Sequence, residues 1–125
     1  MSGTELTLWR TSCVSALASK YLSREDVGVL VMIGAGALAP YLVKAHLWVR
    51  PSLKRVIIWN RNGEKARELV KMFEEEGEIV GVCFEHGECL EKSVGLGDII
   101  TCATSSSSAI VKGNKASLIE FLAFE

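Results

Sequence analysis

The feature that most constrains the fold is a short glycine-rich segment, Gly34-Ala35-Gly36-Ala37-Leu38-Ala39, which has the form G-x-G-x-x-A. It follows a nearly continuous apolar run at residues 27–33 and precedes a helical pattern at about residues 37–49. A strand buried on both faces of a parallel sheet has such a composition. Pro40 suits the first turn of the helix, where a missing N–H costs nothing, and Pro51 lies just past its end. The segment is therefore predicted to turn the chain from a buried strand directly into a helix.

The same alternation of strand and helix continues on both sides of this turn. Apolar runs predict strands, and apolar residues at helical spacing predict helices. Further strands are predicted at 55–59, 79–84 and 98–103, and further helices at 13–22, 64–76 and 89–94. This order gives an α/β fold, a doubly wound parallel sheet of the Rossmann type, incomplete here and forming a single domain. After Ser105 the pattern fades, and the state of residues 117–124 is left open.

Two of the predicted helices carry a clear apolar face. In the helix at 13–22, which Thr11 or Ser12 could cap, this face is formed by Val14, Leu17, Ala18, Tyr21 and Leu22. In the helix at 64–76, which Gly77 is expected to end, it is formed by Ala66, Leu69, Val70 and Phe73.

Composition excludes several classes of partner. At 125 residues the chain suits one domain, and 49% of its residues are hydrophobic. A formal net charge of −1 provides no basic face for nucleic acid or for a membrane surface. The sequence has no secretory signal pattern and no apolar run long enough to span a bilayer. A soluble protein of the cytoplasm or of an organellar stroma is therefore expected.

The cysteines and histidines have no metal-ligand spacing, so no metal site is predicted. The four cysteines are scattered and form no C-x-x-C pair: Cys13, Cys83, Cys89 and Cys102. They are expected to be reduced, mostly buried thiols of an intracellular protein. Both imidazoles, of His46 and His86, are interpreted as structural or solvated.

The glycine-rich segment predicts a site for a dinucleotide. Gly34 would allow the tight turn, Gly36 would let the backbone approach a pyrophosphate, and the small Ala39 would let helix and strand pack closely. The amides of Ala37 and Leu38 would then point at the phosphates, helped by the helix dipole. The alternative is that the glycines only punctuate a strand–helix turn.

The end of the second strand is expected to select the cofactor. NAD-specific sites usually place Asp or Glu there to bind both ribose hydroxyls. This chain has Asn60-Arg61-Asn62 instead, with no carboxylate before Glu64. The planar guanidinium of Arg61 can pair with a 2′-phosphate, which favours NADPH while leaving NADH possible. The alternative is a loop arginine that binds nothing.

A third part of the site is predicted at the end of the fourth strand, at Ala103, Thr104 and Ser105. In this architecture that end borders the ribose and nicotinamide of the cofactor, and small or hydroxylated side chains would allow a close approach. A Ser/Thr-rich loop without a ligand is the alternative.

The chain resembles the ornithine cyclodeaminase/mu-crystallin family over about residues 3–113. The resemblance rests on a series of short segments: Leu6-Thr7-x-x-Arg10-Thr11, the helix Ser15–Leu22, Ile33-Gly-Ala-Gly-Ala-Leu-Ala-Pro40, Val56-Ile-Ile-Trp-Asn-Arg61, Asp98-Ile-Ile-Thr-Cys-Ala-Thr104 and Val111-Lys-Gly113. The Trp-Asn-Arg stretch is more similar to the NADPH-using ketimine reductases than to the NAD-using cyclodeaminases. Among those reductases it is most similar to enzymes that reduce Δ1-piperideine-2-carboxylate to pipecolate.

The resemblance implies roles for two residues near the start of the chain. Arg10 would grip the substrate carboxylate beside the nicotinamide, and Thr11, at the start of its helix, would contact a cofactor phosphate. An arginine at a helix N-terminus beside a diphosphate makes physical sense as an anion clamp. Without the family context, the interpretation that Arg10 is only a surface arginine before a helix would be equally well supported.

The chain also departs from the family pattern at both ends. Residues 1–12 are interpreted as a residual connecting segment, residues 13–113 as the NAD(P)-binding domain and residues 114–125 as a divergent tail. Family members have a longer N-terminal segment with an active-site lysine and the dimer interface, and a later loop with a catalytic aspartate. Neither is matched here, so no catalytic residue is assigned, and a truncated or alternatively terminated product with little activity of its own is expected.

The sequence therefore predicts the NAD(P)H-binding part of a reductase for cyclic imine acids, which forms a homodimer in the full-length family. Two alternatives remain within the resemblance: a non-catalytic dinucleotide-binding or interaction fragment, and an ornithine cyclodeaminase. A third, an S-adenosylmethionine methyltransferase, is disfavoured because no acidic residue ends the second strand.

Overall fold

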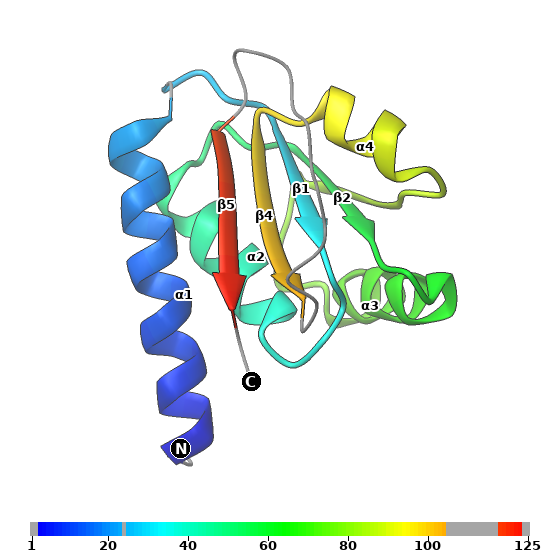
Figure 1. Cartoon of the computed structure of the whole chain (residues 1–125), viewed down its shortest axis with the longest axis horizontal. Coiled ribbons are helices and arrows are strands. Elements are labelled where there is room, and N and C mark those ends of the chain that lie inside the picture. Colours follow the sequence, from blue (N-terminus) through cyan, green and yellow to red (C-terminus); the bar gives the residue numbers. More distant parts are fainter. Residues whose placement is uncertain (1–2, 24, 105–117, 124–125) are drawn as a thin grey trace.

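The computed structural model describes residues 3–23, 25–104 and 118–123. Its elements in chain order are α1 (Gly3–Leu22), β1 (Val29–Ile33), α2 (Ala39–Val49), β2 (Arg55–Trp59), α3 (Gly63–Glu76), β3 (Cys83–His86), α4 (Leu90–Leu96), β4 (Ile99–Thr104) and β5 (Leu118–Ala123). The five strands form one parallel sheet in the order β3-β2-β1-β4-β5 (Figure 1). The predicted Rossmann-type α/β fold in a single domain is confirmed.

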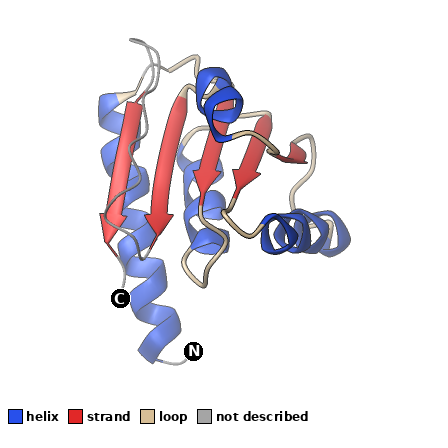
Figure 2. Cartoon of the chain, turned by 45° about the vertical axis from the view of Figure 1, so that its right-hand side comes forward, coloured by secondary structure: helices blue, strands red, loops and turns tan. Residues whose placement is uncertain are grey.

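Helices cover both faces of the sheet, as Figure 2 shows. Leu30 and Met32 of β1 point to one face, where they pack in a core built with α2 and α3. Val31 and Ile33 point to the other face, where Val94 of α4 covers a smaller core. Side chains alternate between the faces of a strand, so a central strand covered on both sides must be apolar throughout. The apolar run in β1 thus has the burial that the sequence predicted.

Local signals placed several elements correctly. β2 has the predicted bounds, and α3 begins one residue before the predicted helix and ends where predicted. The side chain of Asn62 caps the start of α3 by accepting a hydrogen bond from the Glu64 N–H at 3.2 Å. Gly77 ends the helix in the left-handed conformation, with φ of 62°, so the predicted C-cap is confirmed.

Two strands differ from the sequence prediction by more than two residues at an end or were not predicted. β3 was expected at residues 79–84 but spans Cys83–His86. Its pairing explains the shift, because Cys83 lies opposite Arg55, the first residue of β2, and donates its N–H to the Lys54 carbonyl at 2.9 Å. Residues 118–123, whose state the sequence left open, form β5 and pair with the whole of β4.

The first helix is longer than predicted, and its buried side chains are not the apolar residues of the predicted pattern. It begins at Gly3 rather than near Cys13, so the predicted cap at Thr11 or Ser12 is wrong. The apolar residues whose spacing predicted the helix are exposed, with Val14 at 68% and Tyr21 at 81%. The side chains that are buried are mostly small: Leu8, Ser12, Ser15, Ala16 and Ser19.

Small side chains bring α1 close to α2, and a buried histidine completes this contact. His46 of α2 is fully buried, with its Nε2 2.9 Å from the Ser19 hydroxyl and its Nδ1 2.7 Å from the Leu42 carbonyl. A carbonyl can only accept, so Nδ1 donates and Nε2 of the neutral ring accepts from Ser19. Trp9 and Tyr41 add an edge-to-face contact at 4.9 Å. The structural interpretation of His46 is confirmed.

The cysteines are mostly exposed, which corrects the prediction that they are mostly buried. Cys13, Cys83 and Cys89 are exposed, and only Cys102 on β4 is buried. In the part of the chain that the structure describes, no three His, Cys, Asp or Glu side chains are grouped so that they could hold a metal. Over the same residues, no helix has both the length and the apolarity needed to cross a membrane.

Candidate nucleotide-binding site

The glycine-rich turn lies where β1 ends and α2 begins, at the carboxyl edge of the sheet (Figure 1). Gly34 has φ of 108°, a conformation that side-chain-bearing residues rarely adopt, and its N–H donates to the Trp59 carbonyl at 2.8 Å. Ala39 is buried, so the first residue of α2 packs tightly against the core. The turn is therefore as tight as the first glycine and the final alanine predicted.

Backbone conformation does not explain the second glycine, Gly36. Gly36 is exposed and does not have a positive φ, and a Cβ added to it would meet no protein atom within 4 Å. Nothing in the folded chain itself therefore requires glycine at this position. A missing side chain that leaves open space above a turn is what a closely approaching pyrophosphate needs. The arrangement of Gly36 thus fits a dinucleotide.

The start of α2 is also suited to phosphate. Leu38 is the N-cap residue and provides no side-chain hydrogen bond to the first turn. Pro40 occupies the first turn, as predicted. Helix N-termini carry partial positive charge on their N–H groups, so the backbone around Ala37 and Leu38 can stabilise an anion.

The loop after β2 is joined to the glycine turn by one side chain. Asn60 accepts a hydrogen bond from the Ala35 N–H at 3.2 Å and donates from Nδ2 to the Asn62 carbonyl at 2.9 Å. Asn62 caps α3. Both asparagines thus have structural partners within the site, and Arg61 between them is exposed. Of the three predicted side chains, Arg61 is the one left to reach a ligand.

The part of the site predicted at the end of β4 is only partly described. Ala103 is half-buried and packs against the larger core, and Thr104 is the last residue of β4. Ser105 lies outside the described residues. On the same strand, burial raises the pKa of the Cys102 thiol to about 11, so this group is neutral near pH 7.

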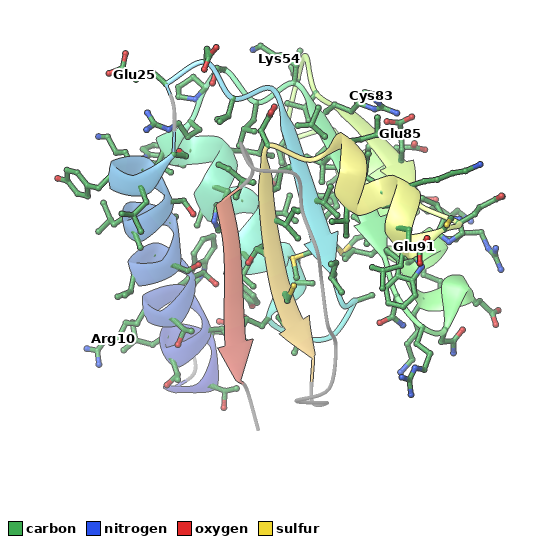
Figure 3. The ribbon with its side chains drawn as sticks, turned by 45° about the horizontal axis from the view of Figure 1, so that its top comes forward. Arg10, Glu25, Lys54, Cys83, Glu85 and Glu91 are labelled. Atoms are coloured by element: carbon green, nitrogen blue, oxygen red, sulfur yellow. The ribbon has the colours of Figure 1, made fainter. Side chains whose placement is uncertain are left out.

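Arg10 and Thr11 are not at the start of a helix, where the resemblance implied Thr11 to be. Both lie inside α1 rather than at a helix N-terminus, so the dipole argument for an anion clamp does not hold for them. Arg10 is exposed, and Figure 3 shows its side chain pointing away from the sheet. Thr11 is half-buried. The structure does not turn Arg10 toward the glycine turn.

One residue near the site was missed by the sequence analysis. His86 is the last residue of β3, and its Nε2 would lie 3.4 Å from a Cβ built on Gly63, the first residue of α3. The sequence prediction ended this strand at Phe84, which left His86 in a loop. Only the pairing of Ile58 with His86 places the imidazole beside the start of α3. No local signal in the sequence could have revealed this.

A separate cleft of about 310 Å³ lies on the α4 side of the sheet. Its lining includes Ile57, the ion pair of Arg55 with Glu85, and Lys92 and Leu96 of α4. The Glu85 carboxylate raises the pKa of Arg55, which keeps this guanidinium charged. The glycine turn takes no part in the lining, but His86 at the end of β3 does.

Curated relatives match most of this chain in sequence. Protein SAR DEFICIENT 4 of Arabidopsis thaliana is 50% identical over 113 residues, 90% of this chain and 35% of that protein. A Δ1-pyrroline-2-carboxylate reductase of Colwellia psychrerythraea is 41% identical over 119 residues, 94% of this chain and 36% of that protein. The chain spans about a third of the length of these curated relatives.

Solved structures share the arrangement. Δ1-pyrroline-2-carboxylate reductase of Thermococcus litoralis, in complex with NADH and L-proline, has a TM-score of 0.87 at 25% identity, over 97% of this chain and 37% of that one. Iminosuccinate reductase of Paracoccus denitrificans, in complex with NAD+, has a TM-score of 0.75 at 34% identity, over 87% of this chain and 32% of that one. The sequence of this chain matches the ornithine cyclodeaminase/mu-crystallin family over residues 1–117. Its parallel sheet, its open glycine turn and this match confirm the resemblance: the chain belongs to the ornithine cyclodeaminase/mu-crystallin family.

Proposed function

We propose that this chain is the dinucleotide-binding part of a reductase for cyclic imine acids and that it favours NADPH over NADH. The observation that carries the proposal is the open turn at Gly36, held against the β2–α3 loop by the bond from Ala35 to Asn60. Reductases for a cyclic imine acid are among its relatives, which supports the reaction type. The related structures hold NADH or NAD+, so the preference for NADPH rests on the residues of this chain.

Cofactor choice follows from the charge at the end of β2. No carboxylate is available there to accept hydrogen bonds from ribose hydroxyls, and Asn60 is already bonded to Ala35 and Asn62. Arg61 offers an exposed guanidinium, which pairs well with a phosphate through two parallel N–H groups. A 2′-phosphate would gain this partner, whereas a free 2′-hydroxyl would gain little.

The other residues of the site would position the two halves of the cofactor. Gly34 and Gly36 would let the backbone approach the pyrophosphate, and Ala103 with Thr104 and Ser105 would border the nicotinamide ribose. When bound, a dihydronicotinamide supplies the hydride that reduces a C=N bond. Arg10 and Thr11 keep their proposed contacts with substrate carboxylate and phosphate from the family resemblance alone.

The test is an equilibrium titration of the chain with NADPH, NADH and S-adenosylmethionine, followed by nicotinamide fluorescence or calorimetry. NADPH is expected to bind most tightly, NADH more weakly, and S-adenosylmethionine not at all. Binding of S-adenosylmethionine without either dinucleotide would overturn the proposal. Tighter binding of NADH than of NADPH would overturn the cofactor preference and leave the dinucleotide site in place.

Turnover by the 125-residue chain on its own is expected to be slow. These residues span about a third of the length of the curated relatives, so groups that a relative takes from its other two thirds are not in the assay, and loss of a general acid typically lowers rates by about 10²–10⁴-fold. NADPH oxidation should be measured with Δ1-piperideine-2-carboxylate and with Δ1-pyrroline-2-carboxylate, beside a full-length relative. A rate within about tenfold of the relative would contradict this expectation.

A further inference from the structure

His86 lies on the same side of the sheet as α3. Along β3, Phe84 stacks on Phe73 of α3 with ring centroids 4.7 Å apart. His86 is two residues further along the strand, so its side chain points to the same face. It reaches the first turn of α3, where its Nε2 and Cε1 would lie 3.4 and 3.8 Å from a Cβ built on Gly63.

Arg67 approaches the same point from within α3. Its Nη1 would lie 3.8 Å from that Cβ position on Gly63. Arg61 precedes Gly63 by two residues, in the loop between β2 and α3. The strand end and the helix thus bring the basic side chains of His86 and Arg67 to Gly63, and the exposed Arg61 lies two residues before it in the loop.

These three side chains are without partners in the described part of the chain. The ion pairs found there use other residues, such as Arg55 with Glu85, and the side-chain hydrogen bonds likewise leave Arg61, Arg67 and His86 unused. The guanidinium of Arg67 can pair with an anion through its N–H groups, and the imidazole of His86 can donate a hydrogen bond to the same anion. An anion beside Gly63 would therefore find both partners there, with Arg61 two residues away in the loop.

We propose that His86 and Arg67 complete, together with Arg61, a subsite for the 2′-phosphate of NADPH, and that they help to select NADPH over NADH. The inference rests on the proposed function, because it assumes that the dinucleotide binds at the glycine turn. A phosphate monoester presents several acceptor oxygens, which two guanidinium groups and one imidazole can bind from different directions. Gly63 contributes by having no side chain between these groups.

The experiment compares His86→Gln and Arg67→Gln with the wild-type chain. Dissociation constants are measured for NADPH and NADH, and also for 2′,5′-ADP and 5′-AMP, which differ only in the 2′-phosphate. Lys71→Gln is the matched control, because Lys71 is an exposed cation on α3 whose partner is Glu75 rather than a residue at the loop. Thermal unfolding of each variant checks that the fold is retained.

Each test substitution is expected to weaken the binding of NADPH and of 2′,5′-ADP by roughly tenfold, the usual effect of losing a charge-assisted hydrogen bond. The dissociation constants of NADH and 5′-AMP should change by less than about twofold. Lys71→Gln should leave all four constants unchanged. Equal losses for NADPH and NADH, or no loss in either variant, would overturn the inference. If the wild type bound neither dinucleotide, the proposed function would fail instead. If Arg61→Ala alone impaired NADPH selectively, only the role of His86 and Arg67 would fail.

Discussion

The side-chain oxygen of Asn60 accepts a hydrogen bond from the backbone N–H of Ala35 at 3.2 Å, across the gap between two loops that follow neighbouring strands. The same side chain donates to the Asn62 carbonyl at 2.9 Å. The loop that would contact the pyrophosphate is thereby held at a fixed position relative to the loop that would contact the adenosine ribose. Such prior fixing lowers the entropic cost of binding a ligand that touches both loops.

Asn60→Ala should therefore weaken the binding of NADPH and of NADH to a similar extent. Loss of one buried or half-buried hydrogen-bonding side chain costs about 0.5–1.5 kcal/mol, which is roughly two- to tenfold in affinity. Calorimetric titration with both dinucleotides measures the two losses of affinity. A loss confined to NADPH would mean that Asn60 contacts the 2′-phosphate directly and does not act by joining the loops.

Arg61→Ala should instead separate the two cofactors. The exposed guanidinium has no described partner in the protein, so its removal should leave the fold and NADH binding nearly unchanged. NADPH should bind on the order of tenfold more weakly, since a charge-assisted pair contributes about 1.5–3 kcal/mol. Parallel titrations with the two cofactors provide the measurement, and equal losses for both would refute the assignment of Arg61.

The two glycines of the turn should respond differently to alanine. Gly34→Ala places a side chain at φ of 108° and should lower the free energy of unfolding by about 1–3 kcal/mol. Gly36→Ala meets no protein atom within 4 Å, so its stability should be close to wild type while dinucleotide binding is lost. Urea unfolding and NADPH titration of both variants test this. Unimpaired binding by Gly36→Ala would show that no ligand approaches the turn closely.

The buried thiol of Cys102 gives a prediction about pH. Burial raises its pKa from 9.0 to about 11, so the folded chain favours the neutral thiol. Its contribution to stability is complete below about pH 9 and is lost as pH rises toward 11, at up to about 1.4 kcal/mol per pH unit.

Urea unfolding at pH 8 and pH 10.5 should show a larger loss for wild type than for Cys102→Ala. In the native chain, a thiol reagent should modify the exposed Cys13, Cys83 and Cys89 quickly and Cys102 only on unfolding. Rapid modification of Cys102 at neutral pH would be inconsistent with its burial.

The sequence by itself determined the features that depend on a few neighbouring residues. The bounds of β2, the end of α3 at Gly77 and the tight turn at Gly34 follow from chain composition, caps and backbone torsions, which act locally. The glycine pattern and the missing carboxylate at Asn60-Arg61-Asn62 also indicated the candidate site before any contact was known.

Tertiary structure alone decided which faces are buried and which distant residues meet. Tyr21 is exposed while Ser19 is buried, because α1 packs against α2, where small side chains allow close approach and Ser19 bonds His46. β3 begins at Cys83 because β2 supplies its partners, and this register alone brings His86 to Gly63. Burial and pairing depend on the surface that the rest of the chain presents, which no local pattern contains.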